Sequence, residues 1–184
     1  ETSYVNYPRN EVQLTPADGF WASTNSYCRF ENVQGSIYYA TDERQKITLS
    51  GVTDSIGWRL YNAELSSTRS KFGTSSLKLN GTNAYAECPM GHLTGAGSSS
   101  QSNTVEFFYY YDGTISTDTP VFNFPGTGIG LYIKGTTKKF HCFGVTHTDH
   151  ASYIAPANTW VHVAWVRSSF TGTTELYVDG LLHW

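Results

Sequence analysis

The run Trp160–Arg167 alternates in a way that defines two faces of one strand. Period-2 spacing places Val161, Val163 and Trp165 on one face. The other face holds Trp160, His162, Ala164 and Val166. Because both faces are largely apolar, we expect a central strand that is covered on both sides. The run Leu176–Gly180 follows, and its final Asp-Gly pair supplies the residue types that a two-residue hairpin turn prefers.

Short segments of this kind recur from about residue 27 onward, separated by turn pairs such as Asn80-Gly81, Asp112-Gly113 and Lys134-Gly135. No helical period lies between them, so the pattern predicts an all-β sandwich or barrel. The expected strands are Tyr27–Glu31, Ser36–Ala40, Lys46–Leu49, Trp58–Tyr61, Ser75–Asn80, Ala84–Glu87, Thr104–Tyr111, Val121–Phe124, Ile129–Lys134, Lys138–Phe143, Trp160–Val166 and Thr174–Val178.

Residues 1–26 lack a sustained period, and two prolines interrupt them. We expect an extended arm that would not fold alone and that packs either on its own domain or on a neighbouring subunit. The arm residues expected to make those contacts are Tyr4, Tyr7, Phe20 and Trp21.

Composition limits the possible partners. A chain of 184 residues fits one domain, or one domain plus an arm. The net charge of −3 comes without a basic run, so nothing supports nucleic-acid binding. No apolar stretch approaches the roughly 18 residues of a membrane span.

Three cysteines, Cys28, Cys88 and Cys142, leave at least one thiol free or bonded to another chain. No C-x-x-C pair supports a zinc or thioredoxin-like site. We interpret them as buried thiols that act as small apolar residues. Such thiols would suit a particle assembled in a reducing cytosol, as a virus is, but they leave the compartment open.

Four segments together resemble the concanavalin A-like sandwich in its laminin G-like branch. They are Lys71–Tyr85, Asn103–Tyr111, Trp160–Arg167 and Leu176–Gly180, and their order and spacing match the family's pattern. In the family, the first segment is an early hairpin with an Asp/Asn-Gly turn. The resemblance implies a two-sheet antiparallel β-sandwich, a concanavalin A-like jelly roll, over residues 27–184.

One departure from the family concerns the segment after the Asp-Gly turn, where a further strand normally returns to the first sheet. The sequence runs only to Trp184, so we expect a sandwich that lacks its closing C-terminal strand. The arm, a neighbouring chain or residues outside this sequence would then cover the open edge, which would otherwise favour aggregation.

The resemblance also carries an expected function. The entry Lys71-Phe72-Gly73 is similar to that of domains common in tail and surface proteins of bacterial viruses and in large bacterial adhesins. It implies a non-catalytic structural or adhesive module at a virion surface or outside the cell. Its partners would be neighbouring copies, other virion proteins or cell-surface glycans. The alternative is a secreted carbohydrate-binding module of a larger bacterial protein.

Aromatic residues on the expected strands are the candidates for binding a glycan or a partner. In Thr104–Tyr111, Phe108 and Tyr110 share one face with Glu106, while the other face is apolar and aromatic. We expect Phe108, Tyr110 and Trp165 to alternate with core residues and to stack on a sugar. Alternatively, the arm or another subunit covers these rings.

Catalysis by a glucanase of this fold would need two Glu and one Asp in an E-x-D-x-x-E pattern, with carboxyl groups roughly 5–5.5 Å apart. No such run exists, since Glu106 stands alone and Asp112 follows beyond a strand end. We therefore expect no catalytic residues, and a glycoside hydrolase is the third alternative.

We expect no metal ligands either. His141 and Cys142 would point to opposite faces of a strand, and His147, Asp149 and His150 fit a solvated loop. Calcium is a family possibility. Its oxygen ligands could include the loop residues Asp112, Asp118 and Asp149, but no motif defines a ligand set.

Overall fold

The protein is described by a computed structural model, in which every assigned element is a β-strand. The described residues are 39–49, 52–87, 102–124, 129–143, 153–168 and 173–183, with side chains from residue 58 onward. None of these residues lies in a helix, and the described part of the chain holds no helix that could cross a membrane. The all-β fold class expected from the sequence is thus confirmed.

The chain divides into two compact units, Glu1–Leu93 (unit 1) and Thr94–Trp184 (unit 2). The expected arm, residues 1–26, lies outside the described residues, as does the expected strand Tyr27–Glu31. The division into an arm and a single sandwich therefore stays a prediction. Each unit has its own sheets and its own apolar core.

Unit 1 contains a three-stranded antiparallel sheet and a two-stranded one. The first has the order β1-β2-β5 and the second pairs β3 with β4. The small core of this unit is formed by Leu60, Ala63 and Leu65. The strands are β1 (Tyr39–Leu49), β2 (Val52–Tyr61), β3 (Glu64–Ser66), β4 (Ser76–Lys78) and β5 (Tyr85–Glu87).

The early hairpin implied by the resemblance does not form, and this expectation was wrong. The strands before and after the Asn80-Gly81 turn pair with different partners, β4 with β3 and β5 with β2. The Asn80 Oδ1 accepts hydrogen bonds from the backbone N–H groups of Thr82, Asn83 and Ala84. This side-chain-directed turn carries the chain from one sheet to the other instead of folding it back on itself.

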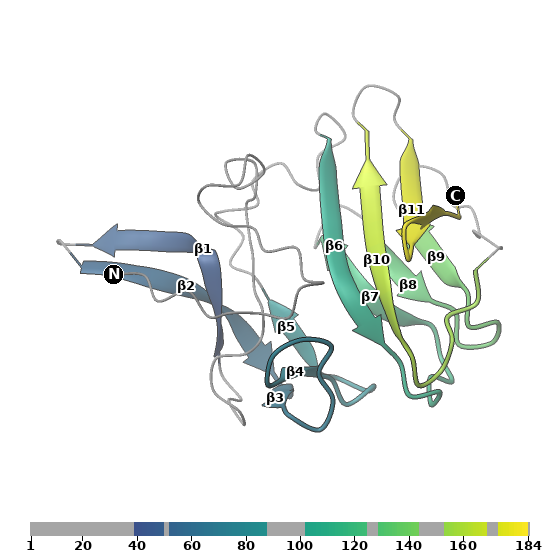
Figure 1. The fold of residues 1–184 in the computed structure, drawn as a ribbon, viewed down its shortest axis with the longest axis horizontal. Helices are drawn as coiled ribbons and strands as arrows, with labels where there is room; N and C mark the ends of the chain where they lie inside the picture. Colours follow the sequence, from purple (N-terminus) through teal and green to yellow (C-terminus); the bar gives the residue numbers. More distant parts are fainter. Residues whose placement is uncertain are drawn as a thin grey trace. The chain divides into compact units, whose positions relative to one another are not determined.

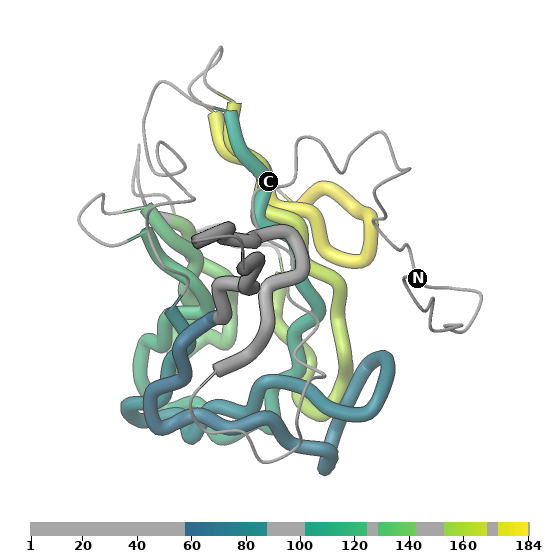
Figure 2. The backbone as a smooth tube through the Cα atoms, turned by 90° about the vertical axis from the view of Figure 1, so that its left-hand side faces the viewer, coloured from purple at the N-terminus to yellow at the C-terminus, as the bar shows by residue number. Residues whose placement is uncertain are grey.

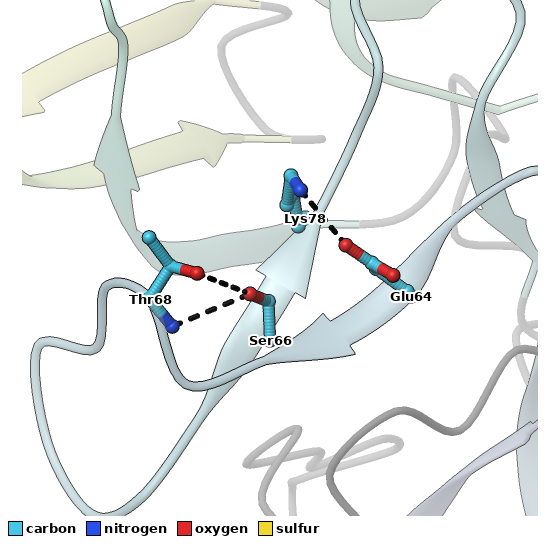
Figure 3. Close-up of polar contacts among 4 residues, drawn as sticks. All are labelled: Glu64, Ser66, Thr68 and Lys78. Atoms are coloured by element: carbon cyan, nitrogen blue, oxygen red, sulfur yellow. Dashed lines mark hydrogen bonds and ion pairs between the residues drawn. The ribbon is translucent and has the colours of Figure 1, made fainter.

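Polar contacts hold the β3–β4 pair at its exposed side (Figure 3). Lys78 Nζ lies 2.8 Å from Glu64 Oε1, across a directly opposed pair of residues. At the end of β3, Ser66 Oγ donates to Thr68 Oγ1 and accepts from the Thr68 N–H, which starts the following turn. Both side chains of the ion pair are largely exposed, so its contribution to stability is at most about 1 kcal/mol.

Unit 2 is built from two antiparallel sheets. The first has the order β12-β11-β10-β6, and the second has the order β7-β8-β9 (Figure 1). In the side view the two sheets form separate layers (Figure 2). Their strands are β6 (Asn103–Tyr110), β7 (Thr119–Phe124), β8 (Ile129–Ile133), β9 (Phe140–Phe143), β10 (Trp160–Arg167), β11 (Thr174–Val178) and β12 (Leu181–Leu182).

The alternation in β10 orders the core between these layers. Odd-numbered residues of β10 are buried, and Trp165 has an exposed fraction of 0 %. The Trp165 ring packs edge-on against Phe122, with centroids 5.4 Å apart, and at a tilt against Phe124. The side chain thus joins the two sheets. Other buried members of this core include Leu131, Ile133, Phe140, Cys142, Val161, Val163, Leu176 and Val178.

β10 occupies the central position in the sheet order that the sequence predicts. Its even-numbered residues are only half-buried, so the expected cover on both faces stays a prediction. The strand pairs with β6 over eight residues without a register shift and with β11 on its other side. The expected Asp-Gly turn is also confirmed: Asp179 and Gly180 have φ values of 50° and 78° and connect β11 to β12. That another segment completes the sandwich edge stays a prediction.

The edge strand β7 tolerates a proline and a register shift. Pro120 lies opposite Tyr132, and the pairing shifts between Pro120 and Phe122. A proline cannot donate to a neighbouring strand, so an edge is where a sheet accepts it. The neighbouring β8 contains Gly130, whose position would place a Cβ only 2.6 Å from the Phe122 carbonyl oxygen.

We expect Gly130→Ala to destabilise the protein by about 3 kcal/mol, because the new Cβ would force β7 and β8 apart. The matched control is Gly180→Ala, where a Cβ meets nothing within 4 Å and the cost of about 1 kcal/mol comes from the positive φ. Urea unfolding followed by tryptophan fluorescence measures both. Equal losses would contradict close approach of the backbones as the cause.

Candidate functional site

The most distinctive exposed surface of unit 2 lies on the face of β6 and β10 that points away from the core. Cross-strand pairing places Phe108 beside His162 and Tyr110 beside Trp160. The Phe108 and His162 rings are 5.0 Å apart, and the Tyr110 and Trp160 rings are 5.3 Å apart, both at tilted angles. We call these four residues the outer ring face. Its most accessible ring, Phe108, is 40 % exposed.

Polar groups border the outer ring face. Glu106 Oε1 lies 2.8 Å from His162 Nε2, and the Tyr110 hydroxyl donates to Asn158 Oδ1 at 3.1 Å. The backbone N–H of His162 donates to Asp179 Oδ1, while its carbonyl accepts from the Asp179 N–H. These two bonds fix the β11–β12 turn to β10 and hold the backbone under the rings.

β11 continues this surface with Glu175 and Tyr177, which alternate with the buried Leu176 and Val178. The Tyr177 hydroxyl donates to Glu175 Oε2 at 2.8 Å. This hydrogen bond to a carboxylate raises the pKa of Tyr177 above its usual value. Carboxylates therefore stand on both sides of β10, each next to an aromatic or imidazole ring.

Of the three ring residues expected to bind a glycan, the structure brings two together and separates the third. Phe108 and Tyr110 lie on the outer ring face, but Trp165 lies on the opposite side of the sheet, buried in the core. The expectation of an accessible Trp165 was wrong. The register decides this: Trp165 stands opposite Val105, and so shares the core-facing side with Phe107.

Trp160 and His162 are the members of the outer ring face that sequence reasoning missed. Their signal was present, since they alternate with Val161 and Val163. Which face of β10 joins the rings of β6 depends on the register between strands, and this follows from tertiary pairing. The expected arm contacts Tyr4, Tyr7, Phe20 and Trp21 lie outside the described residues.

The residues considered for a metal are engaged or dispersed where they are described. Asp118 accepts from Lys134 Nζ and the Gly135 N–H, and these bonds lower the pKa of its carboxyl group. Asp112 Oδ1 accepts from the N–H and the hydroxyl of Thr114. No three His, Cys, Asp or Glu side chains gather among the described residues, and His147, Asp149 and His150 lie outside them.

Cys142 is a free, buried thiol, whereas Cys28 and Cys88 lie outside the described residues. Burial raises the pKa of the Cys142 thiol well above its usual range, and the nearby Trp165 indole offsets only part of this effect. An un-ionised thiol is a poor nucleophile and a poor metal ligand. Cys142 therefore serves as a small apolar residue of the core, as the sequence predicts.

A family model described as the concanavalin A-like lectin/glucanases superfamily matches residues 80–183. This match spans more than half of the chain. The chain belongs to this superfamily. Neither the comparison with curated proteins nor the comparison with solved structures found a match. At a coarse level, a domain of this superfamily fits a carbohydrate-binding or adhesive module.

The core of this concanavalin A-like domain contains a second group that resists ionisation. Burial is the main cause that raises the pKa of Tyr109 from 10.0 to about 12, with smaller electrostatic contributions from Tyr111 and Asp112. The Tyr109 ring packs edge-on against Phe140, with centroids 6.1 Å apart. The phenolate is therefore disfavoured in the folded domain and favoured by unfolding.

We expect the free energy of unfolding to fall as the pH rises from about 10 to about 12. The protonated Tyr109 contributes its full stability below the unfolded pKa, and this contribution, about 2–3 kcal/mol, is lost as the pH approaches the folded pKa. Tyr109→Phe keeps the ring and should show a shallower decline, measured by urea unfolding across this range. Identical slopes for the two proteins would refute the assignment.

Proposed function

We propose that this protein is a non-catalytic adhesive module that binds a carbohydrate on the outer ring face of β6 and β10. The observation that carries the proposal is the pair of cross-strand ring contacts, Phe108 with His162 and Tyr110 with Trp160, on the side of the sheet away from the core, where Phe108 is 40 % exposed. The superfamily match, whose description names lectins, also supports carbohydrate binding.

The chemistry of this surface suits a sugar. An aromatic ring offers an apolar face to the C–H groups of a pyranose, while nearby polar groups bind its hydroxyls. Glu106 and Asn158 supply oxygen acceptors next to the rings. Strand pairing over eight residues holds the rings on a rigid support, so little conformational entropy is lost on binding.

We expect Phe108→Ala and Trp160→Ala each to weaken binding by about tenfold, because each removes one stacking partner worth about 1–1.5 kcal/mol. A glycan array identifies the ligand, and calorimetry with that ligand measures the affinities. Leu181→Ala, which shortens an exposed apolar side chain on β12, is the control and should bind as the unmodified protein does.

Flat binding across the array would count against a lectin. Binding that Phe108→Ala and Trp160→Ala leave unchanged would place the sugar elsewhere on the domain. Loss of binding in the Leu181→Ala control would indicate a general effect of altered surface residues rather than stacking.

The proposed absence of catalysis has its own support. Glu106 is paired with His162, and Glu175 accepts from Tyr177. These carboxylates belong to β6 and β11, strands that are about 10 Å apart because β10 lies between them. A retaining glycosidase places its carboxyl groups only about 5–5.5 Å apart. Hydrolysis of a β-glucan that disappears in Glu106→Gln would overturn this part of the proposal.

For the biological setting, we propose a virion surface, with the secreted module of a larger bacterial protein as the alternative. The support is the resemblance of Lys71-Phe72-Gly73 to the entry segment of virion surface domains. In a virion component, residues 1–26 would cross to a neighbouring copy. Light scattering should then find an oligomer that is lost when these residues are removed. A monomer before and after truncation would contradict the virion setting without affecting the glycan proposal.

A further inference from the structure

A buried arginine stands at the end of β10 on the side of the sheet that faces the core. Arg167 is 2 % exposed and continues the buried series Val161, Val163 and Trp165. It therefore lies at the end of an apolar row, where the other members are valine and tryptophan. A guanidinium is charged at every physiological pH, so this position removes a permanent cation from water.

Two of the three guanidinium nitrogens of Arg167 lack acceptors in the described part of the protein. Its Nε and Nη1 atoms are both buried, and no described residue accepts a hydrogen bond from either atom. Leaving a buried charge unpaired costs several kcal/mol, and protein interiors normally compensate it with an ion pair or a set of hydrogen bonds. The position calls for a negatively charged partner.

Neighbouring strands place further polar groups in the same row, among them Asn103, whose Oδ1 is likewise buried and accepts no hydrogen bond from a described residue. Asn103 on β6 and Thr174 on β11 lie directly opposite Arg167 on either side of it. Directly opposed residues of antiparallel strands project to the same face, so the amide, the guanidinium and the hydroxyl share the core-facing side. Adjacent strands are about 4.8 Å apart, and this spacing lets three such groups converge on one small ligand.

We propose that Arg167, flanked by Asn103 and Thr174, binds a small oxyanion at this end of the core of unit 2. The guanidinium and the neutral O–H donor of Thr174 together match the oxygens of a carboxylate or a phosphate. The site is on the opposite side of the sheet from the outer ring face. It is therefore independent of the glycan proposal, and either one can fail without the other.

Thermal unfolding of the full chain tests the proposal at neutral pH and constant ionic strength, with chloride replaced stepwise by phosphate in one arm and by glucuronate in the other. A ligand that binds only the folded protein raises the Tm in a saturable way. Phosphate also stabilises proteins non-specifically, but that effect does not saturate and does not depend on Arg167. A response to one arm identifies the class of oxyanion.

Three variants sharpen the test. Arg167→Met should abolish the saturable response, and Thr174→Val should weaken the affinity about fivefold through the loss of one hydroxyl donor. Arg59→Met removes an exposed arginine from β2 and should respond as the unmodified protein does. In a spectrum of 15N-labelled protein, the Arg167 Nε–H resonance should shift during the same titration.

No saturable rise in Tm in either arm would overturn the proposal, as would an equal response from Arg167→Met. Should Arg167→Met fail to fold, the Thr174→Val affinity and the Nε–H shift decide. An unchanged resonance together with an unchanged Thr174→Val affinity would then refute the site.

Discussion

The contact of Trp165 with Phe122 and Phe124 is the interaction on which the arrangement of unit 2 depends. It places a fully buried tryptophan of β10 between two sheets that share no strand, with its ring centroid 5.4 Å from that of Phe122 and 6.2 Å from that of Phe124. Burial of this tryptophan and of part of the two phenylalanines removes roughly a few hundred square ångströms of apolar surface from water. The free energy gained by this burial fixes which face of β10 is internal. The alternation of side chains then fixes the direction of every other side chain on the strand.

Both proposed sites, the outer ring face and the Arg167 site, follow from the inward direction of Trp165. With Trp165 inward, Trp160 and His162 point outward and meet the rings of β6, while Arg167 is carried into the interior. A slip of one residue between β6 and β10 would exchange the two sets and bury the outer rings. The full in-register pairing of these strands therefore maintains both surfaces at once.

An ion pair and hydrogen bonds from lysine side chains hold the loops next to the sheets. Lys134 neutralises Asp118, and Lys138 Nζ donates to the backbone carbonyls of Ile115 and Gly135. An ammonium on carbonyl oxygens occupies the kind of position that a bound cation takes in other proteins. These contacts give the described acids of this region structural partners, and they attach the β8–β9 turn to the segment before β7.

The sequence by itself determined the class of the protein and most of its strands. Period-2 patterning and turn pairs identified β6, β8, β10 and β11 within one or two residues, and the Asp179-Gly180 turn followed from its residue types. These features are local, because alternation and positive φ depend on a few adjacent residues. The central place of β10 was also readable, since both of its faces are largely apolar.

Only the tertiary structure decided which strands pair and in which register. The Asn80-Gly81 turn has the sequence of a hairpin, yet β4 and β5 join different sheets, with β3 and β2 as their partners. The choice of these partners depends on tertiary pairing, which the local sequence pattern does not specify. The side of Trp165, the membership of Trp160 and His162 in the outer ring face, and the row of Asn103, Arg167 and Thr174 depend on pairing between segments far apart in the chain. Alternation says which residues of a strand share a face, but only packing against a second sheet says which face is inside.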